Sequence, residues 1–401
     1  MDMKQEEVTT LHDICVDGDK LIKIINEVTS ERPVSIIVPM LYRELKNKAI
    51  GNILKGLNKC TYAEKIVIAL SAENKKEFEE VKRFFGKLKP KHLIMWCNGP
   101  RVTELLKDLK KDGINVLKYR GKGRDVWLAL GITSISSYAI AIHDADIVTY
   151  NELIPAKLLF PILEPELDFK FNKGYYARVN IEKSIIYGRV FRLFLHPLLK
   201  ALVDEIGYEP DLLNFLRSFR YPLSGEFAMT KDISIDLDVP GDWGIEIGIL
   251  AEIYRNVARK RICQTDLGIY EHKHQQIGDE EKGLVKMVRD IFKTLLRVLT
   301  EEDHIQISEE FLISLRVSYL KIARDCIRQY HADSVFNALK HDRHLEETMI
   351  EKFSKHIMDA GSQYLKNPVG TRIPDWLRTM SARKKIREKL FEIVVEENES
   401  K

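Results

Sequence analysis

The sequence of 401 residues lacks a stretch long enough to cross a membrane. Its longest apolar runs, 137–142 and 193–203, fall short of the roughly 20 residues that a membrane-spanning helix needs. The first seven residues, Met1 to Glu7, are polar and acidic, which does not fit a signal peptide. We therefore expect a cytoplasmic protein that makes no contact with a membrane.

Cysteine is scarce as well. The five cysteines are widely scattered, and no two of them have the CxxC spacing of a zinc site. An odd number of distant cysteines does not build a disulfide frame, and free thiols are typical of a reducing compartment. These features exclude a disulfide-stapled secreted fold and a structural zinc site.

An excess of positive charge is also missing. Lys and Arg number 63 against 60 Asp and Glu, which gives a formal net charge of +3. Proteins that bind nucleic acid usually carry a clear basic excess because they contact many phosphates, so we expect no nucleic-acid partner. A small phosphorylated ligand stays compatible with this balance, since two or three Arg or Lys suffice for one phosphate.

Two glycine-rich motifs are absent. No GxGxxG follows the first apolar run, which disfavours a dinucleotide cofactor. Gly121-Lys122-Gly123 does occur before a predicted helix over 124–136, but without the Walker spacing GxxxxGK[ST]. Backbone N–H groups at a helix start favour an anion beside a lysine, although the tripeptide also fits a turn with a solvated lysine.

Between residues 33 and 146 short apolar runs alternate with amphipathic segments. The runs are rich in β-branched residues and suit strands covered on both faces: 34–39, 65–71, 92–97, 116–119 and 137–143. Helical patterns lie between them, for example over 76–87 and 102–111. This alternation predicts an α/β fold with a mostly parallel sheet, whose ligands gather at the carboxyl ends of the strands.

The later part of the chain has a different pattern. An extended aromatic stretch over 169–179 is followed by helices predicted over 189–206 and 245–257. Beyond residue 279 the sequence predicts charged helices and contains no cluster of candidate catalytic or binding residues. Such helices are typical of a segment that serves packing or oligomerisation. We therefore expect four units, with the boundaries 1–32, 33–150, 151–278 and 279–401.

Two aspartates, Asp144 and Asp146, directly follow the apolar run 137–143. Carboxylates at the end of a buried strand point to the ligand edge of the sheet, and such oxygen ligands suit Mg²⁺ or Mn²⁺ bridging a diphosphate. The same spacing occurs in Asp17-Gly-Asp19 and Asp236-Leu-Asp238, but neither follows an apolar strand. Position therefore favours Asp144 and Asp146 as metal ligands over a strand-end cap or a salt bridge.

Further acidic and histidine residues each allow two interpretations. Glu44 follows the first strand, where it can accept hydrogen bonds from a nucleobase edge or serve as an acid in a first helical turn. Glu226, after a Ser-Gly turn, fits a sugar-hydroxyl acceptor or a solvated turn. His272 and His274 follow the apolar stretch 262–270, where one can complete a metal shell or both can be structural.

In their order along the chain these pieces resemble the retaining GT-A glycosyltransferases, specifically the glucosyl-3-phosphoglycerate synthase family. The resemblance covers about residues 33–276 and rests on strings that occur together: Pro39-Met-Leu-Tyr-Arg-Glu44, Asp144-Ala145-Asp146, Lys173-Gly-Tyr-Tyr-Ala-Arg-Val179, Tyr187-Gly-Arg-Val190, Pro222-Leu-Ser-Gly-Glu-Phe-Ala228, Gly244-Ile-Glu-Ile-Gly-Ile-Leu250 and Gln264-Thr-Asp-Leu-Gly-Ile-Tyr-Glu-His272. It implies a GT-A type, Rossmann-like, mostly parallel sheet flanked by helices, with a helical C-terminal appendage. Residues 33–150 would bind the nucleotide sugar and 151–278 the acceptor.

The resemblance also implies an activity. Members of the family transfer glucose from a nucleotide diphosphate sugar, typically UDP-glucose, to the 2-hydroxyl of 3-phosphoglycerate. They keep the α configuration and use Mg²⁺, which Mn²⁺ or another divalent ion can replace. The implied partners are the nucleotide-sugar donor, the phosphoglycerate acceptor and a second copy of the chain in a homodimer.

The same resemblance implies roles for single residues. Donor binding falls to Pro39, Glu44, Ser71, Lys122, Asp144, Ala145, Asp146 and Glu226. Asp146 and His272, together with Asp144, are the implied metal ligands. Catalysis would rest on Asp146, on Lys122 beside the diphosphate and on Glu226 at the sugar hydroxyls. The acceptor would meet Gly188, Arg189 and His274.

Three positions depart from the pattern of the family. Tyr42-Arg43 precede Glu44 where asparagine is common, Phe191 follows the Gly-Arg-Val string where threonine is common, and Tyr270 stands where some members carry arginine. The last two lie near the predicted acceptor pocket.

Other functions stay open. Mannosyl-3-phosphoglycerate synthesis from GDP-mannose is one alternative, because a single glutamate does not distinguish uracil from guanine. A non-catalytic nucleotide-sugar-binding protein is another. A nucleotidyltransferase on a similar scaffold is disfavoured, because no glycine-rich loop follows the first strand.

Overall fold

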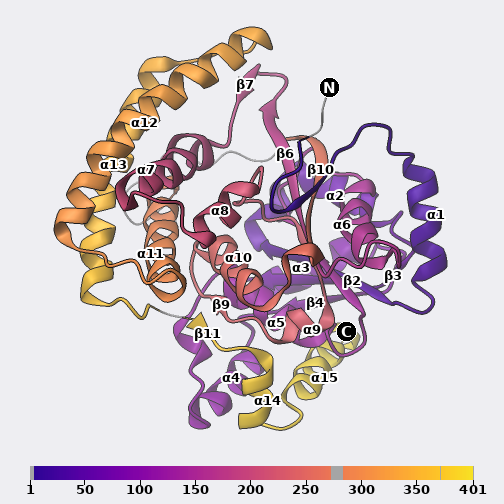
Figure 1. Cartoon of the computed structure of the whole chain (residues 1–401). Coiled ribbons are helices and arrows are strands. Elements are labelled where there is room, and N and C mark those ends of the chain that lie inside the picture. The colour runs from indigo at the N-terminus through magenta and orange to yellow at the C-terminus, as the bar shows by residue number, and fades with distance from the viewer. Residues whose placement is uncertain (1–3, 272–282, 371, 401) are drawn as a thin grey trace.

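A computed structural model describes residues 4–271, 283–370 and 372–400. Within them nine strands form one sheet in the order β1-β10-β6-β8-β5-β2-β3-β4, with β7 beside β6 (Figure 1). The strands are β1 (Thr9–Leu11), β2 (Val34–Leu41), β3 (Ala63–Ser71), β4 (His92–Trp96), β5 (Ala139–Ile142), β6 (Phe171–Asn180), β7 (Ile185–Ile186), β8 (Phe227–Thr230) and β10 (Ile262–Tyr270). β8 is antiparallel to β5 and β6, β7 is antiparallel to β6, and the other pairs are parallel. The predicted α/β fold with a mostly parallel sheet is confirmed.

Apolar side chains on both faces explain why β2 lies inside the sheet, between β5 and β3. Every residue of this strand except Leu41 is buried, and its side chains alternate between two apolar cores, with Ile37 in one and Ile36 in the other. The core around Ile36 includes residues of α1 (Gly18–Val28), α2 (Ala49–Leu57), α3 (Lys75–Phe85) and α6 (Leu153–Leu163). The core around Ile37 includes residues of α4 (Pro100–Lys111), α5 (Lys122–Thr133), α7 (His196–Ile206), α8 (Asp211–Ser218), α9 (Lys231–Ile235) and α10 (Ile245–Asn256).

The strand predicted over 116–119 is wrong. Residues Val116–Lys118 form a 3₁₀ turn, η2. Val116 and Tyr119 are buried while the two residues between them are more exposed. A spacing of three between buried residues fits the three-residue period of this turn and not the two-residue period of a strand.

The helix predicted over 189–206 is divided into two parts. A π-helical turn, η3 (Phe191–Leu195), precedes α7. Pro197 has no N–H, so it cannot donate to the carbonyl of Leu193 as an α-helix would require. That carbonyl instead accepts a hydrogen bond of 2.6 Å from the Tyr319 hydroxyl.

The C-terminal helices pack against the rest of the fold (Figure 1). They are α11 (Leu284–Glu302), α12 (Glu309–Phe336), α13 (Arg343–Lys366), α14 (Trp376–Ala382) and α15 (Ile386–Glu399). α11 lies against α10, and α12 lies between α7 and α13. Their apolar residues join the core around Ile37, so that core continues beyond residue 278. The four predicted unit boundaries stay predictions.

The last part of the chain returns to the sheet. β11 (Arg372–Ile373) pairs antiparallel with β9 (Val239–Pro240), and α15 packs on β4, α4 and α5. The Asn398 side chain forms two hydrogen bonds with the backbone of β4, accepting from Ile94 N at 2.9 Å and donating to Ile94 O at 2.8 Å. In the described part of the chain, no helix combines the length and the apolar character of a membrane span.

A tryptophan pair joins α14 to α5. The rings of Trp127 and Trp376 stack with centroids 4.0 Å apart, and Trp376 Nε1 donates to the carbonyl of Trp127 at 2.8 Å. A Cβ at Gly131 would lie 2.3 Å from the Trp376 ring, so the glycine makes room for it. This contact fixes the C-terminal segment on the helix that begins at Lys122.

We predict that Trp376→Ala lowers the free energy of unfolding by about 3–5 kcal/mol, because it removes a fully buried aromatic side chain and leaves a cavity. Urea titration followed by circular dichroism measures this. The neighbouring Leu377 is 44% exposed, so Leu377→Ala is the matched control and should cost far less. Equal losses for the two variants would contradict the importance of the tryptophan pair.

Candidate active site

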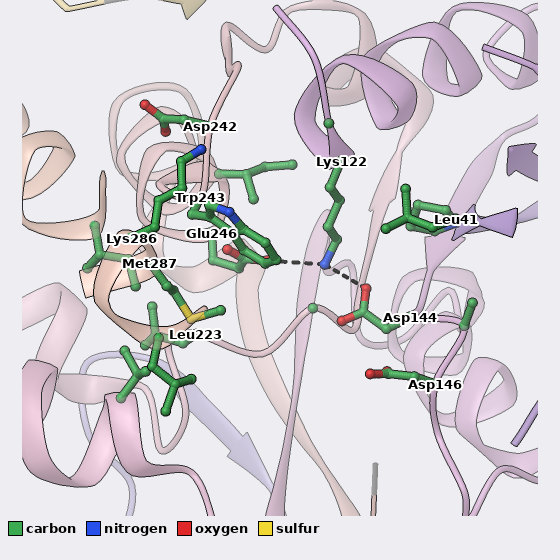
Figure 2. Close-up of a pocket in the computed structure, with 18 of the residues that line it drawn as sticks. Leu41, Lys122, Asp144, Asp146, Leu223, Asp242, Trp243, Glu246, Lys286 and Met287 are labelled. Carbon is green, nitrogen blue, oxygen red and sulfur yellow. Dashed lines mark hydrogen bonds and ion pairs between the residues drawn. The ribbon is translucent and has the colours of Figure 1, made fainter. Parts of the chain in front are cut away.

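A cavity of about 340 Å³ lies at the carboxyl ends of β2 and β5. Its walls come from the ends of these strands, the start of α5, the segment before η3, and the starts of α10 and α11 (Figure 2). Among the predicted site residues, those that line it are Pro39, Glu44, Lys122, Asp144, Ala145, Asp146, Gly188 and Arg189. The fold therefore brings predicted donor residues between Pro39 and Asp146 and the predicted acceptor residues Gly188 and Arg189 to one cavity.

Lys122, the first residue of α5, lies between two carboxylates. Its Nζ is 2.6 Å from Oδ1 of Asp144 and 3.2 Å from Oε1 of Glu246 (Figure 2). Burial opposes the charged form, but the two carboxylates outweigh this effect and hold the pKa of Lys122 above its ordinary value. The lysine is thus a permanent cation at a helix N-terminus, which suits binding of a diphosphate.

Gly225 permits this close arrangement. A Cβ at this position would lie 2.6 Å from Oδ2 of Asp144 and 2.8 Å from Nζ of Lys122. Because both atoms belong to the partly buried ion pair, a side chain at Gly225 would displace one or both of them.

Asp146 carries the negative charge that a cation would relieve. Burial and the neighbouring charge of Asp144 raise the pKa of Asp146 to about 7. Carboxylate oxygens are the ligands that Mg²⁺ and Mn²⁺ prefer, so this pair fits a divalent ion. Across the described residues, no three His, Cys, Asp or Glu side chains gather as a complete metal site. The predicted third ligand, His272, lies outside the described residues, as does His274.

Of the two predicted nucleoside residues, one lines the cavity and the other lies behind it. Glu44, in the 3₁₀ turn η1 (Tyr42–Lys46), is buried and accepts from Asn47 Nδ2 at 3.3 Å. Ser71 does not line the cavity, and its hydroxyl donates to Oδ2 of Asp125 at 2.6 Å. Asp125 itself lines the cavity, so Ser71 orients a second carboxylate there.

Glu226 lies behind the cavity wall. It is fully buried, and its carboxylate accepts from the hydroxyls of Tyr176 at 2.7 Å and Tyr270 at 2.6 Å. It also accepts from the backbone N–H of Asp144 at 3.3 Å. Both tyrosines line the cavity, stacked with ring centroids 3.8 Å apart. A direct contact between Glu226 and sugar hydroxyls does not fit this arrangement, because its carboxylate is enclosed by protein groups.

The predicted acceptor residues stand on the segment between β7 and η3. Gly188 has a φ of 74°, a conformation that favours glycine, and it is buried where the backbone turns towards the cavity. Arg189 follows and lines the cavity. The two departures noted in the sequence also lie close by: Tyr270 lines the cavity, and the Phe191 ring packs on Tyr221 of the wall, with centroids 5.1 Å apart.

Several wall residues were not predicted from the sequence. Glu246 belongs to a string that carried the resemblance, but no role was predicted for it. Beside it stand Asp242 and Trp243, and α11 contributes Lys286 and Met287 (Figure 2). Only Asp242, Trp243 and Glu246 had a sequence signal, a mixture of glycine, acid and aromatic residues. The α11 residues follow an ordinary amphipathic pattern.

Comparison with solved structures identifies the fold. Glucosyl-3-phosphoglycerate synthase from Mycobacterium tuberculosis, in complex with Mn²⁺, UDP and glucosyl-3-phosphoglycerate, matches with a TM-score of 0.54 at 22% identity, covering 73% of this chain and 87% of that one. Mannosyl-3-phosphoglycerate synthase from Rubrobacter xylanophilus matches with a TM-score of 0.54 at 20% identity, covering 74% and 83%. At these identities the likeness is one of fold, and it confirms the predicted GT-A architecture.

Sequence comparison is more specific. No protein-family model matches the chain. However, glucosyl-3-phosphoglycerate synthase from Methanococcoides burtonii is 48% identical over 396 residues, which is 98% of each chain. Its counterpart from Persephonella marina is 39% identical over 375 residues, 92% of each chain. With such identity over nearly its whole length, and with the cavity described above, this chain belongs to the glucosyl-3-phosphoglycerate synthase family of glycosyltransferases.

Proposed function

We propose that this chain transfers glucose, with retention of the α configuration, from UDP-glucose to the 2-hydroxyl of 3-phosphoglycerate. The observation that carries the proposal is the arrangement of the cavity. Lys122 and the carboxylates of Asp144 and Asp146 line it together, and Arg189 lines the same cavity from a separate segment. A reaction between two anionic substrates needs two separate positively charged groups in one site, one for each substrate. The identity to the named relatives supports the same assignment.

The donor would lie along the carboxyl ends of the strands. Pro39 and Glu44 would contact the nucleoside, with Ser71 acting through Asp125. Asp144, Ala145 and Asp146 would lie near the diphosphate, with Asp146 and Asp144 holding Mg²⁺ or Mn²⁺. When bound, such an ion supplies positive charge to the diphosphate oxygens.

The reaction would break the bond between C1 of glucose and the diphosphate oxygen. A bond between C1 and the acceptor 2-hydroxyl oxygen would form on the same face of the sugar, and the hydroxyl proton would pass to the departing UDP. No protein nucleophile is required. Protonated Lys122 would stabilise the negative charge that develops on the diphosphate as this bond breaks.

The sugar would lie between Asp144 and Glu246, whose carboxylates face each other across Lys122. Glu246 would accept hydrogen bonds from glucose hydroxyls. Glu226 would act as a positioning residue, because it holds the Asp144 backbone and the Tyr176 and Tyr270 hydroxyls in place. The acceptor phosphoglycerate would meet Gly188 and Arg189, with His274 still a predicted contact. The homodimer stays a prediction.

A product assay tests the function. The full chain is incubated with Mg²⁺, 3-phosphoglycerate and either UDP-glucose or GDP-mannose, and the products are analysed by mass spectrometry and by the NMR coupling of the anomeric proton. We expect an α-linked glucosyl phosphoglycerate from UDP-glucose. If only GDP-mannose gives a product, the proposed donor UDP-glucose is wrong and the donor is GDP-mannose. A lack of product with either donor would contradict glycosyl transfer and favour a non-catalytic nucleotide-sugar binder.

We predict that Asp146→Asn lowers kcat by about 100-fold or more, because it removes an anionic ligand from the ion that stabilises the leaving group. Chelation by EDTA should abolish wild-type turnover, and added Mg²⁺ or Mn²⁺ should restore it. Asp19→Asn is the matched control, since Asp19 belongs to an exposed motif of the same spacing at the start of α1. Turnover of the Asp146→Asn variant near the wild-type rate under chelation would exclude the metal assignment.

We predict that Arg189→Ala raises the KM for 3-phosphoglycerate by roughly 10- to 100-fold, the loss expected when one charge-assisted hydrogen bond is removed. The KM for UDP-glucose should stay within about twofold of the wild-type value. The acceptor KM of Arg189→Lys should lie between those of the wild type and the alanine variant, because lysine keeps the charge but lacks the planar guanidinium group. Steady-state kinetics with each substrate varied in turn measure this. An unchanged acceptor KM in the alanine variant would refute the role of Arg189.

A further inference from the structure

We propose that Arg192 and Glu346 are positioning residues for the acceptor site. Their buried ion pair holds the segment Tyr187-Gly188-Arg189 against the C-terminal helices, so that α13 takes part in acceptor binding although it does not line the cavity. The inference rests on the proposed function only for the identity of the acceptor.

The Arg192 guanidinium connects three groups. Its Nε donates to the carbonyl of Tyr187 at 2.9 Å, and its Nη2 donates to the carbonyl of Ile186 at 3.4 Å. The same Nη2 donates to Oε1 of Glu346 at 2.7 Å. Arg192 is 6% exposed and Glu346 is 8% exposed, so solvent hardly screens this pair.

These contacts fix the backbone immediately before Arg189. The two carbonyls belong to the residues that precede Gly188, whose positive φ sets the direction of the chain into Arg189. The backbone N–H of Arg192 also donates to the carbonyl of Gly188 at 2.9 Å. Arg192 thus forms hydrogen bonds with three consecutive carbonyls of the turn, those of residues 186–188. Glu346 joins Arg192, and with it the turn, to α13.

Other contacts join the same segment to the C-terminal helices. The N–H of Lys340 donates to the carbonyl of Ser184 at 2.6 Å, and Ile185 forms a parallel bridge with Lys340. The Arg192 guanidinium lies 4.7 Å from the centre of the Tyr330 ring of α12. Figure 1 shows β7 beside the paired helices α12 and α13 at the edge of the molecule. The chain on both sides of Gly188 and Arg189 therefore contacts α12, α13 and the residues between them.

The ion pair is better explained by position than by stability. Buried ion pairs lose much hydration, and well-packed apolar replacements are often equally stable. Oε2 of Glu346 has no hydrogen-bond partner among the described residues, and it lies 3.9 Å from Nδ1 of His341. A buried carboxylate oxygen without a hydrogen bond lowers the free energy of unfolding, so this ion pair is a poor source of stability. It does orient the Arg192 guanidinium towards the carbonyls of Ile186 and Tyr187.

The test replaces both charges at once. A single change such as Glu346→Met leaves Arg192 buried without its partner and risks unfolding. The double variant Arg192→Met/Glu346→Met removes both charges and should keep the fold, with a melting temperature within a few degrees of wild type. The control is Glu347→Gln, since Glu347 forms an exposed ion pair with Arg343 on the same helix.

In the folded double variant we expect the KM for 3-phosphoglycerate to rise about 10-fold, with the KM for UDP-glucose within twofold of wild type. Adding Arg189→Ala should then raise the acceptor KM less than it does in the wild type, because both changes disable the same contact. The Glu347 control should match wild type. An acceptor KM within twofold of wild type, or equal rises for both substrates, would overturn the proposal.

Hydrogen exchange separates this inference from the proposed function. If the wild type makes no product from 3-phosphoglycerate, the proposed function fails while the positioning role can still be measured. Amides in residues 181–190 should then exchange about 10-fold faster in the double variant than in the wild type, with those of the central strands unchanged. Equal exchange of residues 181–190 in the two proteins would overturn the positioning role whatever the acceptor.

Discussion

Two carboxylates from opposite walls of the cavity, Asp144 and Glu246, converge on the single ammonium group of Lys122. Three elements meet through this contact: the end of β5, the start of α5 and the start of α10. A Cβ at position 225 would come within 3 Å of both charged groups, so any residue other than glycine would shift them. Without the lysine, two partly buried negative charges would face each other, so the arrangement of these side chains depends on this one cation.

The C-terminal helices complete the site from outside. α11 supplies part of the wall, α12 and α13 hold the segment that carries Arg189, and α14 packs on α5 through the tryptophan pair. The walls of the cavity are thus supported by helices in whose sequence no group of functional residues was predicted. Its contribution is mechanical, and a change far from the cavity can reach Arg189 through Glu346.

The sequence predicted what depends on local pattern. Buried strands appear as apolar runs, and an aspartate pair directly after one of them must lie at the ligand edge of the sheet, which is where Asp144 and Asp146 are. The turn over 116–118 was misread because a run of four residues does not separate a three-residue from a two-residue period. The enclosure of Glu226 by Tyr176 and Tyr270, and the pairing of Arg192 with Glu346 over 154 positions, arise from tertiary packing that no local spacing encodes.

The Asn398 side chain, paired with both backbone groups of Ile94, occupies the place that a neighbouring strand would take beside β4. An open edge strand is a template on which another chain can add, and apolar edge strands promote aggregation. Asn398 follows Ile94 by 304 positions, so β4 is made well before the group that covers it. During synthesis the edge of the sheet at β4 therefore stays uncovered until α15 has docked, and an exposed edge in that interval can pair with another chain.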